Sequence, residues 1–213
     1  MSGFLDIIST WWPVLLAYVI GATPFGFLAG KSRGIDIRDH GSGNIGATNV
    51  LRTLGKPVGI TVLILDVLKG MMPVLIAKWV GADTLVQIAT AAAAILGHNY
   101  TFWLGFKGGK GIATTGGALL PIMPIAILSA IVLWILALKI TRYVSVASIV
   151  AALTIPAVLT IRSFISSEWD IPVLCLGLFV CVLAIWKHRA NIARLRRGEE
   201  NRFGKLTSPP SQD

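Results

Sequence analysis

The sequence has 213 residues, of which 54% are hydrophobic and 14% charged, and its mean hydropathy is +0.75. This composition excludes a soluble globular domain and is typical of a protein embedded in a bilayer. The formal net charge of +9 lies in loops rather than in a soluble basic domain, which argues against nucleic acid and favours anionic lipid and anionic substrates as partners.

Seven apolar segments have the hydropathy of membrane helices. They cover residues 11–30, 57–80, 84–96, 112–120, 122–138, 144–161 and 171–186. Most approach the ~20 residues that a spanning helix needs, but the fourth would form only about 13.5 Å of helix. That segment must begin within the preceding loop, lie in a thinned region or re-enter. The sequence predicts an all-α integral membrane protein, a bundle of seven transmembrane helices with a short fourth helix.

The basic residues predict the topology. With seven crossings, residues 31–56, 107–110, 139–142 and the C-terminal tail fall on one side and hold every Lys and Arg except Lys69, Lys78 and Arg162. The positive-inside rule places these loops and the C-terminus in the cytoplasm and the N-terminus outside. Five crossings would move some basic loops to the opposite face.

The rest of the chain organisation is simple. No Lys or Arg precedes Lys31, so a cleavable signal peptide is not expected. We expect a single membrane domain over residues 1–198 and, from its Ser, Pro, Gln and Lys content, a disordered cytoplasmic tail over 199–213.

Neither the cysteines nor the histidines predict a special site. Cys175 and Cys181 lie six residues apart on different helix faces, so they are expected to pack rather than to form a disulfide. His40, His98 and His188 are far apart and lack paired ligands. Metal and cofactor are therefore not expected.

The first of three glycine-rich, basic motifs reads GSGNIGATNVLR over residues 41–52. It follows a membrane helix rather than a strand, which argues against a dinucleotide fold. Its glycines could form an anion nest and its polar side chains could donate hydrogen bonds. The alternative is a flexible connector, but the fixed charge of Arg52 favours binding. The candidates are Gly41, Ser42, Gly43, Asn44, Gly46, Thr48, Asn49 and Arg52.

The second motif reads GHNYTFWLGFKGGKGIAT over residues 97–114. Its GFKGGK is one residue short of a Walker A loop and continues with glycine, so the chain is not an NTPase. Lysine charge, loop glycines and a following helix N-terminus can still hold phosphate. Either lysine could instead be a topology determinant, and Lys110 is the stronger ligand candidate. The candidates are Lys107, Gly108, Gly109, Lys110, Gly111 and Thr114.

The third motif reads KHRANIARLRRG over residues 187–198. Helical geometry places His188 and Asn191 on one face, while the opposite, arginine-rich face suits lipid phosphates. His188 could be a helix-end or surface residue, but its partner one turn on favours a ligand role.

Two polar pairs interrupt the apolar segments. Asp66 and Lys69 share a helix face and are interpreted as a self-neutralising structural pair, although ionisable residues in membranes are often functional. Ser145 and Ser148 begin the sixth segment at a depth where they could touch a polar substrate, and the alternative is a helix–helix hydrogen bond.

Together, the three motifs resemble those of the bacterial integral-membrane acyl-phosphate:glycerol-3-phosphate acyltransferases. The family patterns are GSGNxGATNxxR, GHxxxxxxxFxGGKGxAT and KHxxNIxRLxxGxE, and residues 41–52, 97–114 and 187–200 match them throughout. The resemblance covers nearly the whole chain and implies seven transmembrane helices.

The resemblance also implies an activity. A fatty acyl group would pass from acyl phosphate to the 1-hydroxyl of glycerol 3-phosphate, giving lysophosphatidic acid and inorganic phosphate at the cytoplasmic face of the bacterial inner membrane. This is the first step of phospholipid synthesis, and an acyl-phosphate-forming enzyme would be a functional partner. Ser42, Gly43, Asn44 and Gly46 would form the acyl-phosphate site. Arg52, Lys110, Ser148, His188 and Asn191 would hold glycerol 3-phosphate, and with Ser42 the catalytic set is Ser42, Arg52, Lys110, His188 and Asn191.

The sequence predicts direct attack. Five positions after the three histidines stand Ile45, Trp103 and Ala193, so the His/Asp dyad of soluble glycerolipid acyltransferases is missing. No nucleophile is evident either, and a phosphate oxygen of the donor could accept the proton. A transporter is less favoured because the basic residues cluster on one side without an inverted repeat. A lipid-binding scaffold would leave the glycine motifs unexplained.

Overall fold

The computed structural model describes residues 2–204, and every secondary-structure element in that range is a helix. The N-terminal group contains α1 (Ser2–Ala22), α2 (Phe25–Lys31), η1 (Ile37–Asp39), α3 (Ala47–Leu54), α4 (Lys56–Trp79), α5 (Thr84–Asn99), η2 (Phe102–Leu104) and α6 (Ile112–Leu119). The C-terminal group contains α7 (Pro124–Thr141), α8 (Val144–Ser166), α9 (Ile171–Lys187) and α10 (Arg189–Arg196). The expected all-α architecture is confirmed.

Four helical stretches in the described part of the chain are long and apolar enough to span a bilayer. They are Ser9–Lys31, Lys56–Trp79, Pro124–Thr141 and Val144–Ser166, and the pair α9 and α10, bent by 52°, would make a fifth. Helix α5 has 16 residues and α6 has 8, so both are short for a crossing. The count of seven and the orientation of the termini therefore remain predictions.

The first expected segment is interrupted between α1 and α2, where Pro24 lacks a backbone N–H. Two side chains from elsewhere in the fold bind carbonyls at the break. The Lys69 ammonium donates to the Thr23 carbonyl at 2.8 Å, and the Thr101 hydroxyl donates to the Ala22 carbonyl at 2.5 Å. Backbone groups freed within a membrane helix need such partners, so these contacts stabilise the break.

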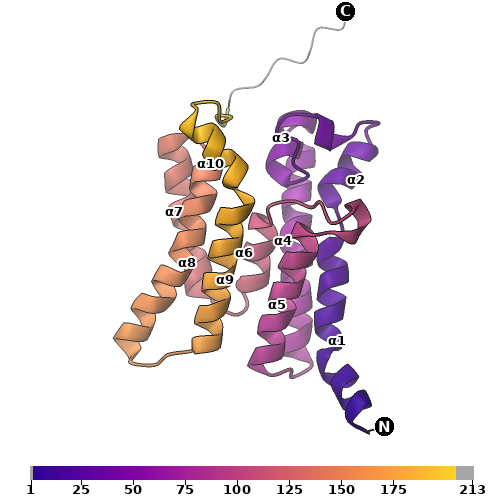
Figure 1. The fold of residues 1–213 in the computed structure, drawn as a ribbon, viewed down its shortest axis with the longest axis vertical. Helices are drawn as coiled ribbons and strands as arrows, with labels where there is room; N and C mark the ends of the chain where they lie inside the picture. The colour runs from indigo at the N-terminus through magenta and orange to yellow at the C-terminus, as the bar shows by residue number, and fades with distance from the viewer. Residues whose placement is uncertain (1, 205–213) are drawn as a thin grey trace, which may run out of the picture.

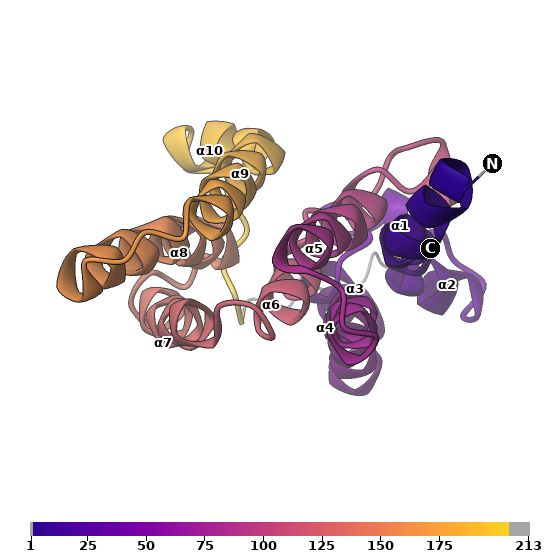
Figure 2. The ribbon, with the colours of Figure 1, turned by 90° about the horizontal axis from the view of Figure 1, so that it is seen from below.

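The helices form two groups, visible in Figure 2, with α6 between them. Within the N-terminal group, α1 packs on α5 and α4 on α6. The α4–α6 contact is close because Gly70 faces the backbone of Thr114 and Gly117 faces the backbone of Val67. Small residues at these positions let two helix backbones approach, as is common in membranes.

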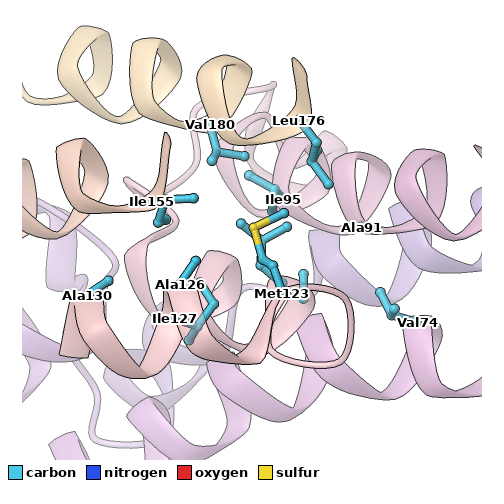
Figure 3. Packing of buried hydrophobic residues seen from close by; sticks show 12 residues of the cluster. Val74, Ala91, Ile95, Met123, Ala126, Ile127, Ala130, Ile155, Leu176 and Val180 are labelled. Atoms are coloured by element: carbon cyan, nitrogen blue, oxygen red, sulfur yellow. The ribbon is translucent and has the colours of Figure 1, made fainter. Parts of the chain in front are cut away.

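A buried apolar cluster joins the two groups (Figure 3). Val74 of α4 and Ile95 of α5 lie in the same cluster as Ile155 of α8 and Val180 of α9. Both cysteines are free thiols; Cys181 is buried in a second cluster, as expected for a packing residue, whereas Cys175 is exposed, contrary to that expectation. The cluster fixes how the two groups meet and so positions the space between them.

The three motifs lie at one end of the molecule. Figure 1 shows α3, the loop before α6 and α10 at the end opposite the N-terminal start of α1. The segment after α10 was expected to be disordered from residue 199, but its first residues make specific contacts. The Phe203 amide donates to the Arg142 carbonyl at 2.7 Å, and Arg202 Nε donates to the Tyr143 hydroxyl at 3.0 Å. Residues 205–213 of the expected tail lie outside the described residues.

Candidate active site

A cavity of about 550 Å³ lies between the two helix groups. Its wall is largely apolar and includes Leu63, Leu120, Ile127, Ile131 and Trp134. Most of its polar lining comes from the three motifs and from the start of α8. The sequence candidates that line it are Ser42, Asn44, Gly46, Thr48, Asn49, Arg52, Lys110, Gly111, Ser145, Ser148, His188 and Asn191.

The first motif folds around the side chain of Asn49, which is 2% exposed. Its Nδ2 donates to the carbonyls of Ile37 (3.1 Å) and His40 (2.9 Å), and its Oδ1 accepts from the Ser42 amide at 2.8 Å. These bonds join α3 to the segment that precedes it. Asn49 therefore shapes the motif and is not an open donor for a substrate.

The structure does not leave these backbone amides free to form the anion nest expected in this motif. The Ser42 amide is held by Asn49, the Gly46 amide donates to Asn44 Oδ1 at 2.9 Å, and the Gly43 amide donates to the His40 carbonyl. Gly41 and Gly43 have positive φ and are exposed outside the cavity lining. The motif instead presents the first turn of α3 and the side chains of Ser42, Thr48 and Arg52.

The glycines of the second motif bring the loop against the C-terminal end of α5. The Gly108 amide donates to the Asn99 carbonyl (3.2 Å) and the Gly109 amide to the His98 carbonyl (3.1 Å). A Cβ on Gly109 would collide with the His98 ring. These two glycines therefore serve close packing rather than a direct anion cradle.

The remaining candidates of the second motif differ in whether they line the cavity. Lys107 is exposed and lies outside the cavity lining, and Thr114 is fully buried in α6 at the contact with α4. Lys110 and Gly111 line the cavity. The structure thus brings the stronger of the two lysine candidates to the site.

Lys110 donates a hydrogen bond to Asn191 Oδ1, which joins the second motif to the third. Burial, together with the nearby cations Arg194, Arg52 and Lys187, lowers the pKa of Lys110 to about 8 against the opposing charge of Glu200. Burial also lowers the pKa of Arg52. Two partly desolvated cations in one cavity attract an anion, because its arrival offsets their mutual repulsion.

In the third motif, His188 and Asn191 are buried on the inward side, as expected, and Arg196 and Arg197 are exposed. His188 Nδ1 lies 2.7 Å from the Ala184 carbonyl. A carbonyl oxygen only accepts, so Nδ1 carries the proton and Nε2 is the basic nitrogen of the neutral ring. The 52° bend between α9 and α10 brings His188 and Asn191 to the cavity.

Ser145 and Ser148 both line the cavity from the first turns of α8. Ser145 Oγ donates to Glu200 Oε1 at 2.9 Å, and Ser148 Oγ donates to the Val144 carbonyl at 2.8 Å. The indole N–H of Trp134 donates to Ser148 Oγ at 3.3 Å. The Ser148 hydroxyl is thus oriented by its own helix and by α7.

Several polar residues that line the cavity are not among the sequence candidates, and they include Glu200, His98 and Asp66. The composition of residues 199–213 assigns Glu200 to the tail, although the Gly-x-Glu end of the third motif is a usable signal for it. Asp66 pairs with Lys69 at 2.7 Å, which agrees with the structural interpretation of that pair. His98 Nδ1 lies 3.8 Å from Asp66 Oδ1, beyond hydrogen-bond distance.

The family model for glycerol-3-phosphate acyltransferase matches residues 11–198. The chain belongs to this family. It is 49% identical to the glycerol-3-phosphate acyltransferase of Geobacter sulfurreducens over 190 residues, covering 88% of this chain and 94% of the relative. It is 46% identical to that of Desulforudis audaxviator over 189 residues, covering 88% and 92%.

Two solved structures of an integral membrane glycerol 3-phosphate acyltransferase, PlsY (YgiH), share the fold. The glycerol 3-phosphate form has a TM-score of 0.86 at 41% identity, and the lysophosphatidic acid form has 0.83 at 40%. Each match covers 93% of this chain and 97% of the solved chain. This glycerol-3-phosphate acyltransferase family member is accordingly a membrane protein, in agreement with its apolar helices.

Proposed function

We propose that the protein transfers a fatty acyl group from acyl phosphate to the 1-hydroxyl of glycerol 3-phosphate, giving lysophosphatidic acid and inorganic phosphate. The observation that carries this proposal is one cavity with two kinds of wall. Arg52 and Lys110 both line it, and apolar side chains of both helix groups form much of the remaining wall. Such a cavity suits a ligand with a phosphate at one end and an acyl chain at the other.

The two substrates divide the polar end between them. Ser42, Asn44, Gly46 and Thr48, beside the first turn of α3, suit the acyl-phosphate group. Arg52, Lys110, Ser148, His188 and Asn191 suit glycerol 3-phosphate, with the cations on its phosphate and the neutral groups on its hydroxyls. The glycerol 3-phosphate form of the related PlsY supports this acceptor.

The reaction needs no covalent enzyme intermediate. The 1-hydroxyl oxygen attacks the acyl carbonyl carbon, the bond from that carbon to the phosphate oxygen breaks, and the hydroxyl proton passes to the departing phosphate. The phosphate leaves as hydrogen phosphate, so atoms and charges balance. Lys110 and Arg52 stabilise the anionic groups, and the site supplies proximity and orientation.

The histidines support this substrate-assisted route. His98 packs against Gly109 and lies beyond hydrogen-bond distance of Asp66, whose carboxylate is paired with Lys69. His188 is held by a backbone carbonyl rather than by a carboxylate. Neither therefore has the orienting carboxylate partner of a strong general base.

The proposed location is the bacterial inner membrane, with the site facing the cytoplasm. The basic segments lie at the end of the molecule that carries the three motifs (Figure 1), and the positive-inside rule assigns that end to the cytoplasm. An acyl-phosphate-forming enzyme would then supply the donor from the same side.

The donor is tested with purified protein in lipid nanodiscs and radiolabelled glycerol 3-phosphate. Palmitoyl phosphate, palmitoyl-CoA and palmitoyl carrier protein are offered separately. We expect labelled lysophosphatidate from palmitoyl phosphate alone. Product from a thioester instead would overturn the proposed donor, and no product from any of the three would overturn the proposed activity.

A further inference from the structure

Glu200 follows α10 and lines the cavity, with a side chain that is only 6% exposed. Its neighbour Glu199 is a useful contrast, because that side chain is 58% exposed and pairs with Arg197 outside the cavity. A buried carboxylate needs hydrogen-bond or charge partners to offset its lost hydration. The partners of Glu200 therefore show how its charge is stabilised in the cavity wall.

Three side chains donate to the Glu200 carboxylate. Oε1 accepts from Asn191 Nδ2 at 2.6 Å and from Ser145 Oγ at 2.9 Å, and Oε2 accepts from Arg194 Nε at 2.8 Å. Burial alone would raise the pKa of Glu200, but these hydrogen bonds hold it below its ordinary value. Glu200 is therefore a fixed negative charge at neutral pH.

This carboxylate determines the orientation of the Asn191 amide. A carboxylate only accepts hydrogen bonds, so the NH₂ group of Asn191 must face Glu200. An ammonium only donates, so the amide oxygen must face Lys110, which donates to it. The flipped amide would place acceptor against acceptor and donor against donor. One side-chain rotamer of Asn191 thus satisfies both neighbours.

We propose that Glu200 is a positioning residue for phosphate recognition, which orients the Asn191 amide and through it holds the Lys110 ammonium in the cavity. The inference rests on the proposed function, since it names the residue that prepares the same phosphate site. Glu200 acts through Asn191 and Lys110 and need not touch the substrate. Nothing in the motif geometry assigns this task to Glu199.

The charges around Lys110 make this role measurable. The groups that act on it are Glu200 and three cations, Arg194 of α10, Arg52 of α3 and Lys187 of α9, while neutral His188 lies close by. Glu200 is the negative member of that set. A neutral side chain in place of Glu200 would leave the cations unopposed and would lower the pKa of the Lys110 ammonium further.

The test compares Glu200→Gln with the control Glu199→Gln in nanodiscs, using kcat/KM for glycerol 3-phosphate between pH 6 and 10. For Glu200→Gln we expect kcat/KM to be about tenfold lower at pH 7. We also expect the alkaline limb, the part of the pH profile where kcat/KM falls as pH rises, to move to lower pH by about one unit. Glu199→Gln should leave both unchanged. A loss of activity in Glu200→Gln with an unmoved limb would overturn the proposal, because a merely structural role does not shift the limb.

Arg194→Gln provides a second variant if Glu200→Gln does not fold. It removes a cation near Lys110 and keeps the Glu200 charge, so the alkaline limb should move to higher pH. An alkaline limb that stays at the same pH or moves to lower pH would overturn the proposal.

Calorimetric binding of glycerol 3-phosphate across the same pH range separates this inference from the proposed reaction. A parent protein that binds glycerol 3-phosphate but makes no product would refute the donor or reaction, while the pH shift of binding still tests Glu200. A parent protein that binds no glycerol 3-phosphate would overturn the inference as well.

Discussion

Lys110 donates a hydrogen bond to Asn191 although 81 residues separate them in sequence. The bond links the loop before α6 to α10, and so connects the two helix groups at the polar end of the cavity. Because Lys110 is mostly buried, its charge is not freely hydrated. Under the proposed function, an incoming phosphate would therefore meet a cation that is already held in place.

The first prediction concerns this cation. Lys110→Ala should lower kcat/KM for glycerol 3-phosphate by about 100-fold or more, because it removes a preorganised charge from a partly desolvated site. Steady-state assays measure the change. Lys139→Ala, an exposed lysine at the same end of the molecule, serves as control, and Lys107→Ala should cost less than Lys110→Ala. Near-normal turnover in Lys110→Ala would remove it from the site.

The second prediction follows from the pKa of Lys110, which burial lowers to about 8. Below that pH the ammonium is charged and can bind phosphate as proposed, and above it the charge is lost. We expect kcat/KM for glycerol 3-phosphate to fall as pH rises past about 8, since this parameter reports the free enzyme. The substrate's own phosphate is fully ionised there, with a second pKa of about 6. Lys110→Arg should flatten this limb, and an unchanged limb in that variant would assign it to another group.

The third prediction concerns His188. His188→Ala should raise KM for glycerol 3-phosphate by about tenfold with a smaller change in kcat, because the proposed role of the ring is to bind substrate rather than to act as a base. The pH–rate profile near neutrality should keep its shape. Disappearance of a limb near neutrality in the variant, with KM unaltered, would instead identify His188 as the general base.

The fourth prediction tests the contact between α4 and α6. Gly117→Ala should lower the thermal stability of the protein, because the new Cβ would collide with the Val67 carbonyl. Gly116→Ala is the matched control one residue earlier, where a Cβ meets nothing within 4 Å. Melting in nanodiscs, followed by circular dichroism, compares the two. Equal melting temperatures would show that the helices can separate without cost.

The fifth prediction tests the buried pair at the α1–α2 break. Lys69→Met should destabilise the protein by about 3–5 kcal/mol, because it leaves the Asp66 carboxylate unpaired in the interior. The double variant Asp66→Asn, Lys69→Met should recover part of that loss. Stability is compared by thermal melting of both variants. A double variant no more stable than the single one would show that the Lys69 contact with the Thr23 carbonyl dominates.

Much of this arrangement could be predicted from the sequence because membrane helices carry a strong local signal. Hydropathy located the apolar segments, and helical periodicity placed His188 and Asn191 together. The break at Pro24 was missed because its freed carbonyls are bound by Lys69 and Thr101, which are distant in sequence. Local patterns carry no information about such partners.

The same limit applies to the site. Glycine motifs indicated phosphate loops, yet Gly108 and Gly109 use their small size to pack against α5. A motif shows that glycine is present but not which neighbour needs the space. Glu200 was assigned to a disordered tail on composition, whereas three donors from α8 and α10 hold it at the cavity. Only the tertiary structure brings those donors together.

The most direct test of the central claim is the stoichiometry of one reaction. Purified protein in nanodiscs is given palmitoyl phosphate and glycerol 3-phosphate, and released phosphate and 1-acyl lysophosphatidate are measured over the same time course. Direct acyl transfer predicts equal amounts of both products, with release dependent on glycerol 3-phosphate. Phosphate release without the acceptor, or lysophosphatidate without matching phosphate, would contradict the account.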